Sequence, residues 1–143
     1  QPVIKIPEEI FIPDEYINDL DVKMSIYKRI SLITNNQEKN NLMAELVDRF
    51  GKLPTEVENL FKLIEIKILC LKNNIEQIEF GKNGILFSFY QNRPHNPDKT
   101  LNVGLSNNKQ INIRSDQKIF YNFNGNKNHE RFKLIKNIIH KIS

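Results

Sequence analysis

The stretch NLMAELVDRFGKLPTEVE, residues 41–58, contains the end of one predicted helix and the start of the next. Apolar residues recur at helical spacing up to Gly51, and glycine is the preferred residue for a left-handed C′ position just after a helix end. Pro54 then interrupts the helical pattern. Thr55 and Glu58 have the spacing of a capping box, in which two side chains satisfy free amides in the first turn of a helix. The stretch therefore predicts two helices joined by a short turn.

A further helix is predicted on the N-terminal side, over about 21–33, with Asp19 or Asp21 as its N-cap. A polar break separates it from the helix that ends at Gly51. Within this break, Asn35 and Glu38 repeat the spacing of a capping box. The sequence therefore predicts two consecutive helices before Gly51, each with a capping residue at its start.

The helix that begins near residue 55 continues to about residue 72 and has a broad apolar face. Apolar side chains at i, i+3, i+4 and i+7 indicate a helix that packs against a core. The residues predicted to face that core are Val57, Leu60, Phe61, Ile64, Ile68 and Leu71. The first part of the chain is therefore predicted to contain three helices.

From residue 74 the apolar residues alternate, which predicts strands. Residues 75–80 and 85–90 flank a four-residue loop, Gly81–Gly84, and are predicted to form a hairpin. Residues 91–98, with two prolines, are predicted to form a loop, and residues 100–107 fit either a short helix or a strand. Two more strands are expected over 111–114 and 119–123. A last helix over about 128–142 is expected to bury Phe132, Ile135, Ile139 and Ile142.

The order of these elements predicts an α+β fold: an N-terminal three-helix segment, then a small, mostly antiparallel sheet and a C-terminal helix. Pro2, Pro7 and Pro13 favour extended backbone near the start of the chain. We therefore expect residues 1–18 to be an extended lead-in from an upstream domain, although trimming of a chain would leave the same pattern. Residues 19–143 are expected to form a single domain, because their number is a usual domain size.

Charge is unevenly distributed along the chain, whose net charge is +4. Residues 1–65 contain 8 basic and 12 acidic side chains, whereas residues 66–143 contain 13 basic and 5 acidic ones. Such asymmetry can indicate a basic partner for the first part and an acidic one for the second, or it can serve solubility alone. No apolar run is long enough for a membrane span, and the single cysteine suits a reducing compartment, so a cytoplasmic monomer is expected.

Motifs for catalysis, nucleotide binding or metal binding are missing from the sequence. There is no G-x-G-x-x-G stretch, phosphate-binding loop or H-E-x-x-H motif, and Cys70, His95, His129 and His140 fall in unrelated predicted elements. We therefore expect no catalytic residue, no cofactor and no metal.

Two patterns could instead bind nucleic acid. The last helix is rich in lysine and arginine, and alternating aromatic residues, Phe87, Phe89, Phe120, Tyr121 and Phe123, could stack on bases. Burial of these aromatics in a core and a solvated basic face are the alternatives. A nucleic-acid-binding accessory module that uses the basic C-terminal half is therefore a second functional hypothesis.

The helix that ends at Phe50 separates its charged and apolar residues. Its charged residues Glu45, Asp48 and Arg49 lie on or beside the side opposite its apolar ones, which are Leu42, Met43, Leu46, Val47 and Phe50. Such a face can simply be solvated, or it can dock another protein or domain.

Two stretches of the sequence are distinctive: IPDEYI at 12–17, followed by Asp19 and by YKR at 27–29, and ELVDRFGKLP at 45–54. The first resembles the start of the C-terminal domain of bacterial transcription-repair coupling factors, and the second resembles the E-L-I-D-R-F-G-x-L-P motif of that domain. The segment IEQIE at 75–79 with Gly84 resembles the family's hairpin. Beyond residue 90 only the order of elements agrees.

The resemblance implies that residues 19–143 are the noncatalytic C-terminal regulatory domain of a large ATP-dependent DNA translocase. Such a translocase removes stalled RNA polymerase and recruits UvrA in nucleotide excision repair. In the family this domain packs on the UvrB-like module of the same chain and covers its UvrA-binding surface, an autoinhibitory arrangement. UvrA, RNA polymerase and DNA would then be indirect partners. The family's interdomain interface residues match Glu45, Asp48 and Arg49.

Overall fold

The computed structural model describes residues 1–106, 110–123 and 130–143. The chain divides into two compact units. Residues 8–68 form one, here called the helical unit, and residues 1–7 and 69–143 form the other, the sheet unit. The predicted α+β class is confirmed. The predicted folding of residues 19–143 as one domain stays a prediction.

The helical unit contains α1 (Leu20–Ser31), α2 (Asn36–Phe50) and most of α3 (Thr55–Lys72), and thus confirms the three predicted helices. Of the two candidate caps for α1, Asp19 is the one used, because its carboxylate accepts from the backbone N–H of Val22 at 3.0 Å. The side chain of Asn35 accepts from the Glu38 N–H at 2.9 Å, and the Glu38 carboxylate accepts from the Thr34 hydroxyl at 2.9 Å. Each such cap stabilises a helix by about 1 kcal/mol.

The turn between α2 and α3 begins at Gly51, as predicted, but both of its ends differ from the prediction in detail. The predicted left-handed conformation of Gly51 is wrong, because its ψ is −166°. Gly51 has a φ of +92°, and its N–H donates to the carbonyl of Val47 at 3.0 Å. The predicted cap at Thr55 is wrong, since the Glu58 N–H donates to the carbonyl of Pro54 at 2.9 Å. Pro54 therefore occupies the N-cap position, and Thr55 is already helical.

The core of the helical unit includes residues from the predicted lead-in. Ile12 and Ile17 are 3% and 2% exposed, and they belong to the same cluster as residues of α1, α2 and α3, among them Ile26, Leu42, Leu46, Val57, Phe61 and Ile64. The predicted burial of two residues is wrong, because Val47 is 47% exposed and Leu71 is 59% exposed. Val47 lies at the edge of the apolar face, whose centre is formed by Leu42 and Leu46, and Leu71 lies in the last turn of α3.

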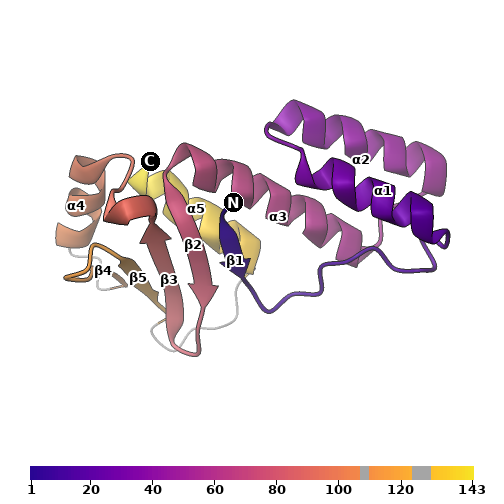
Figure 1. Cartoon of the computed structure of the whole chain (residues 1–143). Helices are drawn as coiled ribbons and strands as arrows, with labels where there is room; N and C mark the ends of the chain where they lie inside the picture. The colour runs from indigo at the N-terminus through magenta and orange to yellow at the C-terminus, as the bar shows by residue number, and fades with distance from the viewer. Residues whose placement is uncertain (107–109, 124–129) are drawn as a thin grey trace. The chain divides into compact units, whose positions relative to one another are not determined.

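Among its described residues, the sheet unit contains five strands in the order β1-β2-β3-β5-β4 (Figure 1). The strands are β1 (Val3–Lys5), β2 (Ile75–Phe80), β3 (Gly84–Phe89), β4 (Ile111–Ile113) and β5 (Ile119–Asn122). The predicted hairpin is confirmed, with the N–H of Gly81 donating to the carbonyl of Gly84 at 2.8 Å. Strand β1 pairs in parallel with β2, so the sheet is mostly antiparallel, as predicted, with one parallel edge that was not predicted.

The described part of the sheet unit also contains two helices and one 3₁₀ turn. The ambiguous segment is helical: α4 spans Pro97–Leu105, and the Asn96 side chain accepts from the Lys99 N–H at 3.1 Å. The predicted loop over 91–98 is thus shortened by α4 and by the 3₁₀ turn η1 (Tyr90–Asn92). The last helix, α5, spans Arg131–Ile142, and its four predicted core residues are all buried. Its predicted start near residue 128 lies outside the described residues. No helix in the described ranges is long and apolar enough to cross a membrane.

Candidate docking surface on helix α2

Helix α2 presents the three predicted interface residues away from the core of the helical unit. Leu42 and Leu46 are 3% and 0% exposed, whereas Asp48 and Arg49 are exposed and Glu45 is half-buried. We call Glu45, Asp48 and Arg49 the docking surface. A rigid helix holds all three, but their role in an interface stays a prediction.

Glu45 is bound within the chain by two arginines. Its Oε2 accepts from Arg29 Nη1 at 2.6 Å, and its Oε1 accepts from Arg29 Nη2 at 2.8 Å. The same Oε2 accepts from Arg49 Nη1 at 3.1 Å. Parallel hydrogen bonds from one guanidinium to both carboxylate oxygens are the strongest form of this contact.

The two hydrogen bonds from Arg29, together with the one from Arg49 and the positive charge of both arginines, outweigh the partial burial of the carboxylate. They lower the pKa of Glu45 from 4.5 to about 2. The hydrogen bond to Glu45 in turn raises the pKa of Arg29. Glu45 and Arg29 therefore both stay charged near neutral pH.

Arg29 was not predicted as a site residue. It lies on α1, 16 residues before Glu45, so no spacing rule within one helix could connect the two. One signal was present, because the YKR segment at 27–29 is part of the stretch that carries the family resemblance.

A tyrosine from the lead-in supports the end of α2 below the docking surface. The Tyr16 hydroxyl donates to the carbonyl oxygens of Gly51 at 2.8 Å and Leu46 at 3.1 Å. Its ring centroid lies 5.8 Å from that of Phe50, and the Arg49 guanidinium lies 4.8 Å above the Phe50 ring. These contacts join the two stretches of sequence that carry the resemblance, and they fix Arg49 beside the helix end.

A groove of about 320 Å³ runs beside Glu45. Its apolar walls are formed by Leu32, Ile33 and Leu42, and Arg29, Glu38, Asn41 and Glu45 supply its polar groups. Leu32 is 66% exposed. The groove therefore combines apolar surface with charged groups of both signs, a composition suited to a protein side chain.

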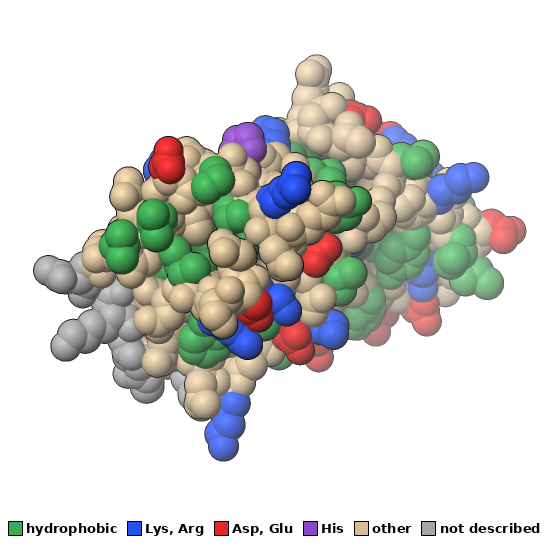
Figure 2. All heavy atoms as spheres, turned by 60° about the vertical axis from the view of Figure 1, so that its left-hand side comes forward, with side chains coloured by type: hydrophobic (Ala, Val, Ile, Leu, Met, Phe, Trp, Pro, Cys, Tyr) green, Lys and Arg blue, Asp and Glu red, His purple; other side chains and the backbone are tan. Residues whose placement is uncertain are grey.

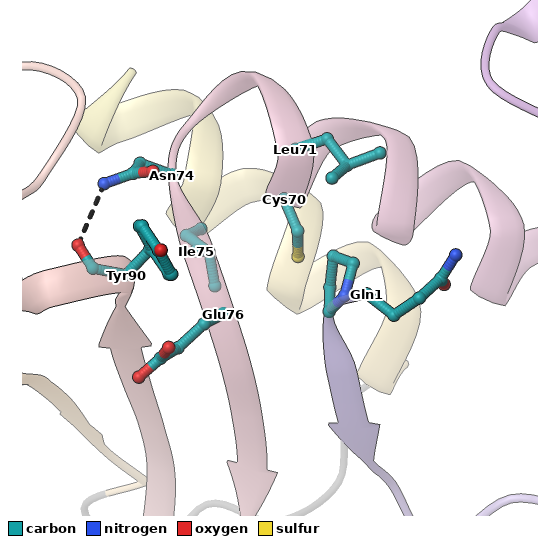
Figure 3. Close-up of a pocket in the computed structure, with 8 residues that line it drawn as sticks. Gln1, Cys70, Leu71, Asn74, Ile75, Glu76 and Tyr90 are labelled. Carbon is teal, nitrogen blue, oxygen red and sulfur yellow. Dashed lines mark hydrogen bonds between the residues drawn. The ribbon is translucent and has the colours of Figure 1, made fainter.

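A second groove, of about 310 Å³, lies in the sheet unit (Figure 3). Leu71 and Tyr90, 59% and 57% exposed, line it together with the buried Cys70. The Asn74 amide donates to the Tyr90 carbonyl at 3.1 Å, and Glu76 is the only carboxylate in the lining. Across the described part of the chain, no three His, Cys, Asp or Glu side chains lie close enough to bind a metal ion.

The structure also locates the residues on which nucleic-acid binding would depend. Phe87, Phe89, Tyr121 and Phe123 are all buried, which confirms the core interpretation, while Phe120 is half-buried. On the face shown in Figure 2, basic and acidic side chains are mixed with hydrophobic ones. That face therefore lacks the uniformly basic surface that phosphate binding favours.

Comparison with known proteins identifies a family. A family model described as the TRCF domain matches residues 6–100. Relatives named transcription-repair-coupling factor include those of Rickettsia conorii, 38% identical over 120 residues, and Haemophilus influenzae, 33% identical over 103 residues. These alignments cover 84% and 72% of this chain but only 11% and 9% of the relatives. A crystal structure of the C-terminal domain of transcription-repair coupling factor has the same fold, with a TM-score of 0.78 at 21% identity over 97% of this chain and 88% of that one.

Proposed function

The chain belongs to the TRCF domain family, and we propose that it acts as the noncatalytic C-terminal domain of a longer transcription-repair coupling factor, where it keeps that protein closed. In this proposal the docking surface of α2 packs on the UvrB-like module of the same polypeptide and masks the surface that binds UvrA. The longer protein would be the ATP-dependent translocase that acts on stalled RNA polymerase.

The observation that carries the proposal is the presentation of Glu45, Asp48 and Arg49 together on one rigid helix. Their backbone is fixed by the buried Leu46 and by the Tyr16 contacts to Leu46 and Gly51. The helical unit contains 8 basic and 12 acidic side chains, so its long-range field favours a partner with basic groups. A preformed charged face of this kind orders few side chains when it docks.

A tethered domain can hold such a contact closed although each ion pair is weak. Exposed pairs contribute about 0.2–1 kcal/mol each. The effective concentration of a tethered partner, however, is in the millimolar range for short flexible linkers, so a few such pairs can mask a site. Interfaces between domains of one chain are polar enough to open. A translocation state that favours the open form would expose the UvrA-binding surface and allow UvrA to bind.

The test is reversal of charge at Asp48 in the full-length protein. Asp48→Lys should place a positive charge against the basic groups of the partner module, and this repulsion should open the contact. The exposed surface should then bind UvrA tenfold more tightly or better. Basal ATPase activity should rise with it. Because Asp48 is exposed, the thermal unfolding of the 143-residue chain should stay within about 0.5 kcal/mol of the parent.

Two controls separate docking from folding. Leu46→Ala removes a fully buried side chain and should lower the free energy of unfolding by about 2–5 kcal/mol. Glu58→Lys makes the same charge change at an exposed position of α3, outside the docking surface. If Asp48→Lys leaves UvrA affinity at the parental value, or if Glu58→Lys changes it equally, this surface is not the contact.

A further inference from the structure

Both oxygens of the Glu45 carboxylate are already bound inside the chain. Arg29 donates one hydrogen bond to each oxygen, and Arg49 donates a second one to Oε2. A carboxylate accepts about four hydrogen bonds, so three of its positions are filled. The one open position is on Oε1, so a guanidinium of a docking partner can bind both carboxylate oxygens only by displacing one of the arginines.

Arg29 is the arginine that can leave without disturbing α2. It lies on a different helix, whereas Arg49 is one turn away from Glu45 and stacks on Phe50. The side chain of Arg29 is 45% exposed, so its head group can turn into solvent without unfolding. Leu32 and Ile33 form apolar walls of the groove beside Arg29, and the methylene groups of the displaced Arg29 side chain can pack against them.

We propose that Arg29 is an internal competitor of the docking partner: it pairs with Glu45 in the free chain, and a cationic side chain of the partner replaces it when the surface docks. This inference rests on the proposed function and deepens it, because it specifies the chemistry of the partner at Glu45. The acidic excess of the helical unit agrees with a cationic partner. Competition weakens the closed state, so that it can open in response to a moderate signal.

The size of the effect follows from the cost of breaking one exposed bidentate pair. Pairs of this kind contribute about two- to fivefold to an equilibrium constant. In the full-length protein, Arg29→Gln should therefore shift the equilibrium toward the closed form and weaken UvrA binding by about two- to fivefold. This is the opposite direction to the change expected for Asp48→Lys.

Lys28→Gln is the matched control. Lys28 is the exposed neighbour of Arg29 on α1, and its substitution removes the same charge without touching Glu45. Its UvrA affinity should equal that of the parent. A second measurement is the titration of the Glu45 carboxyl by NMR in the 143-residue chain, where Arg29→Gln should raise the pKa above its parental value of about 2.

Each other outcome overturns the inference. If Arg29→Gln tightens UvrA binding, Arg29 itself contacts the partner, and if it changes nothing, there is no competition. If Lys28→Gln changes UvrA affinity by the same amount, the effect comes from the net charge of the chain and not from the Arg29–Glu45 pair. If the pKa of Glu45 is the same in Arg29→Gln as in the parent, Arg29 and Glu45 do not form an ion pair in solution. If Asp48→Lys also fails to change UvrA affinity, the proposed function is contradicted, whereas failure of Arg29→Gln alone contradicts only the competition.

Discussion

Glu45 combines a half-buried side chain with two guanidinium partners, and this makes its charge unusually resistant to acid. A folded-state pKa of about 2, below the ordinary 4.5, means that the unfolded chain takes up the proton first. The stability that Glu45 contributes is therefore complete above about pH 4.5 and is lost as the pH falls toward 2.

The direction of this pKa shift predicts a measurable difference in acid stability between the parental chain and a variant without the carboxylate. Between pH 6 and pH 3 the parental chain should lose more free energy of unfolding than Glu45→Gln does, by up to about 1 kcal/mol, since the pair is partly exposed. Urea unfolding of the 143-residue chain at both pH values measures the difference. Arg29→Gln should reduce the acid dependence in the same way. Equal acid sensitivity of parent and Glu45→Gln would show that the pair does not contribute to stability.

At the scale of elements, the end of α2 depends on a backbone conformation that glycine alone adopts easily. Gly51 combines φ +92° with ψ −166°, outside the left-handed helical region that asparagine tolerates. A Cβ added at Gly51 would meet no atom within 4 Å, so any cost of a substitution arises from the backbone and not from crowding.

Gly51→Ala should therefore destabilise the chain by about 1–3 kcal/mol, and Gly51→Asn should be no better than alanine. Thermal unfolding compares both with Gly81→Ala, where a Cβ would make an ordinary 3.6 Å contact and the effect should be small. Recovery of stability by asparagine would indicate that the turn relaxes into the left-handed region, contrary to the structure.

Local signals account for the elements that could be predicted from sequence. The caps at Asp19 and Asn35 and the turn of the hairpin depend on residues within four positions of one another, and all three were found. The parallel pairing of β1 was missed because its partner strand begins some seventy residues later. Arg29 was missed for the same reason, since its bond to Glu45 depends on how two helices pack. The face of α2 was predicted correctly except at Val47, which lies where the apolar stripe meets solvent.

At the scale of the whole molecule, the two units have opposite charge. The sheet unit contains 13 basic and 5 acidic side chains, against 8 and 12 in the helical unit. A positive unit attracts phosphate without reading sequence, because base recognition needs side chains placed against base edges. Its buried aromatics are not available for stacking.

The 143-residue chain should therefore bind DNA only weakly, without preference among sequences, and with an affinity that falls steeply as salt rises. Fluorescence anisotropy with two unrelated duplexes at 50 and 200 mM salt is a sufficient measurement. Submicromolar binding at physiological salt with a clear preference for one duplex would favour the nucleic-acid-binding hypothesis instead.

The parallel pairing of β1 with β2 has a consequence for how the chain assembles. Val3 lies opposite Gln77, so the first strand of the sheet can join its neighbour only by closing a loop that contains the entire helical unit. Closing a loop costs more entropy as it lengthens, and a folded insert shortens the flexible part that remains to be closed. We therefore expect β1 to pair with β2 only after the helical unit has folded, because the folded unit shortens the loop that this pairing must close.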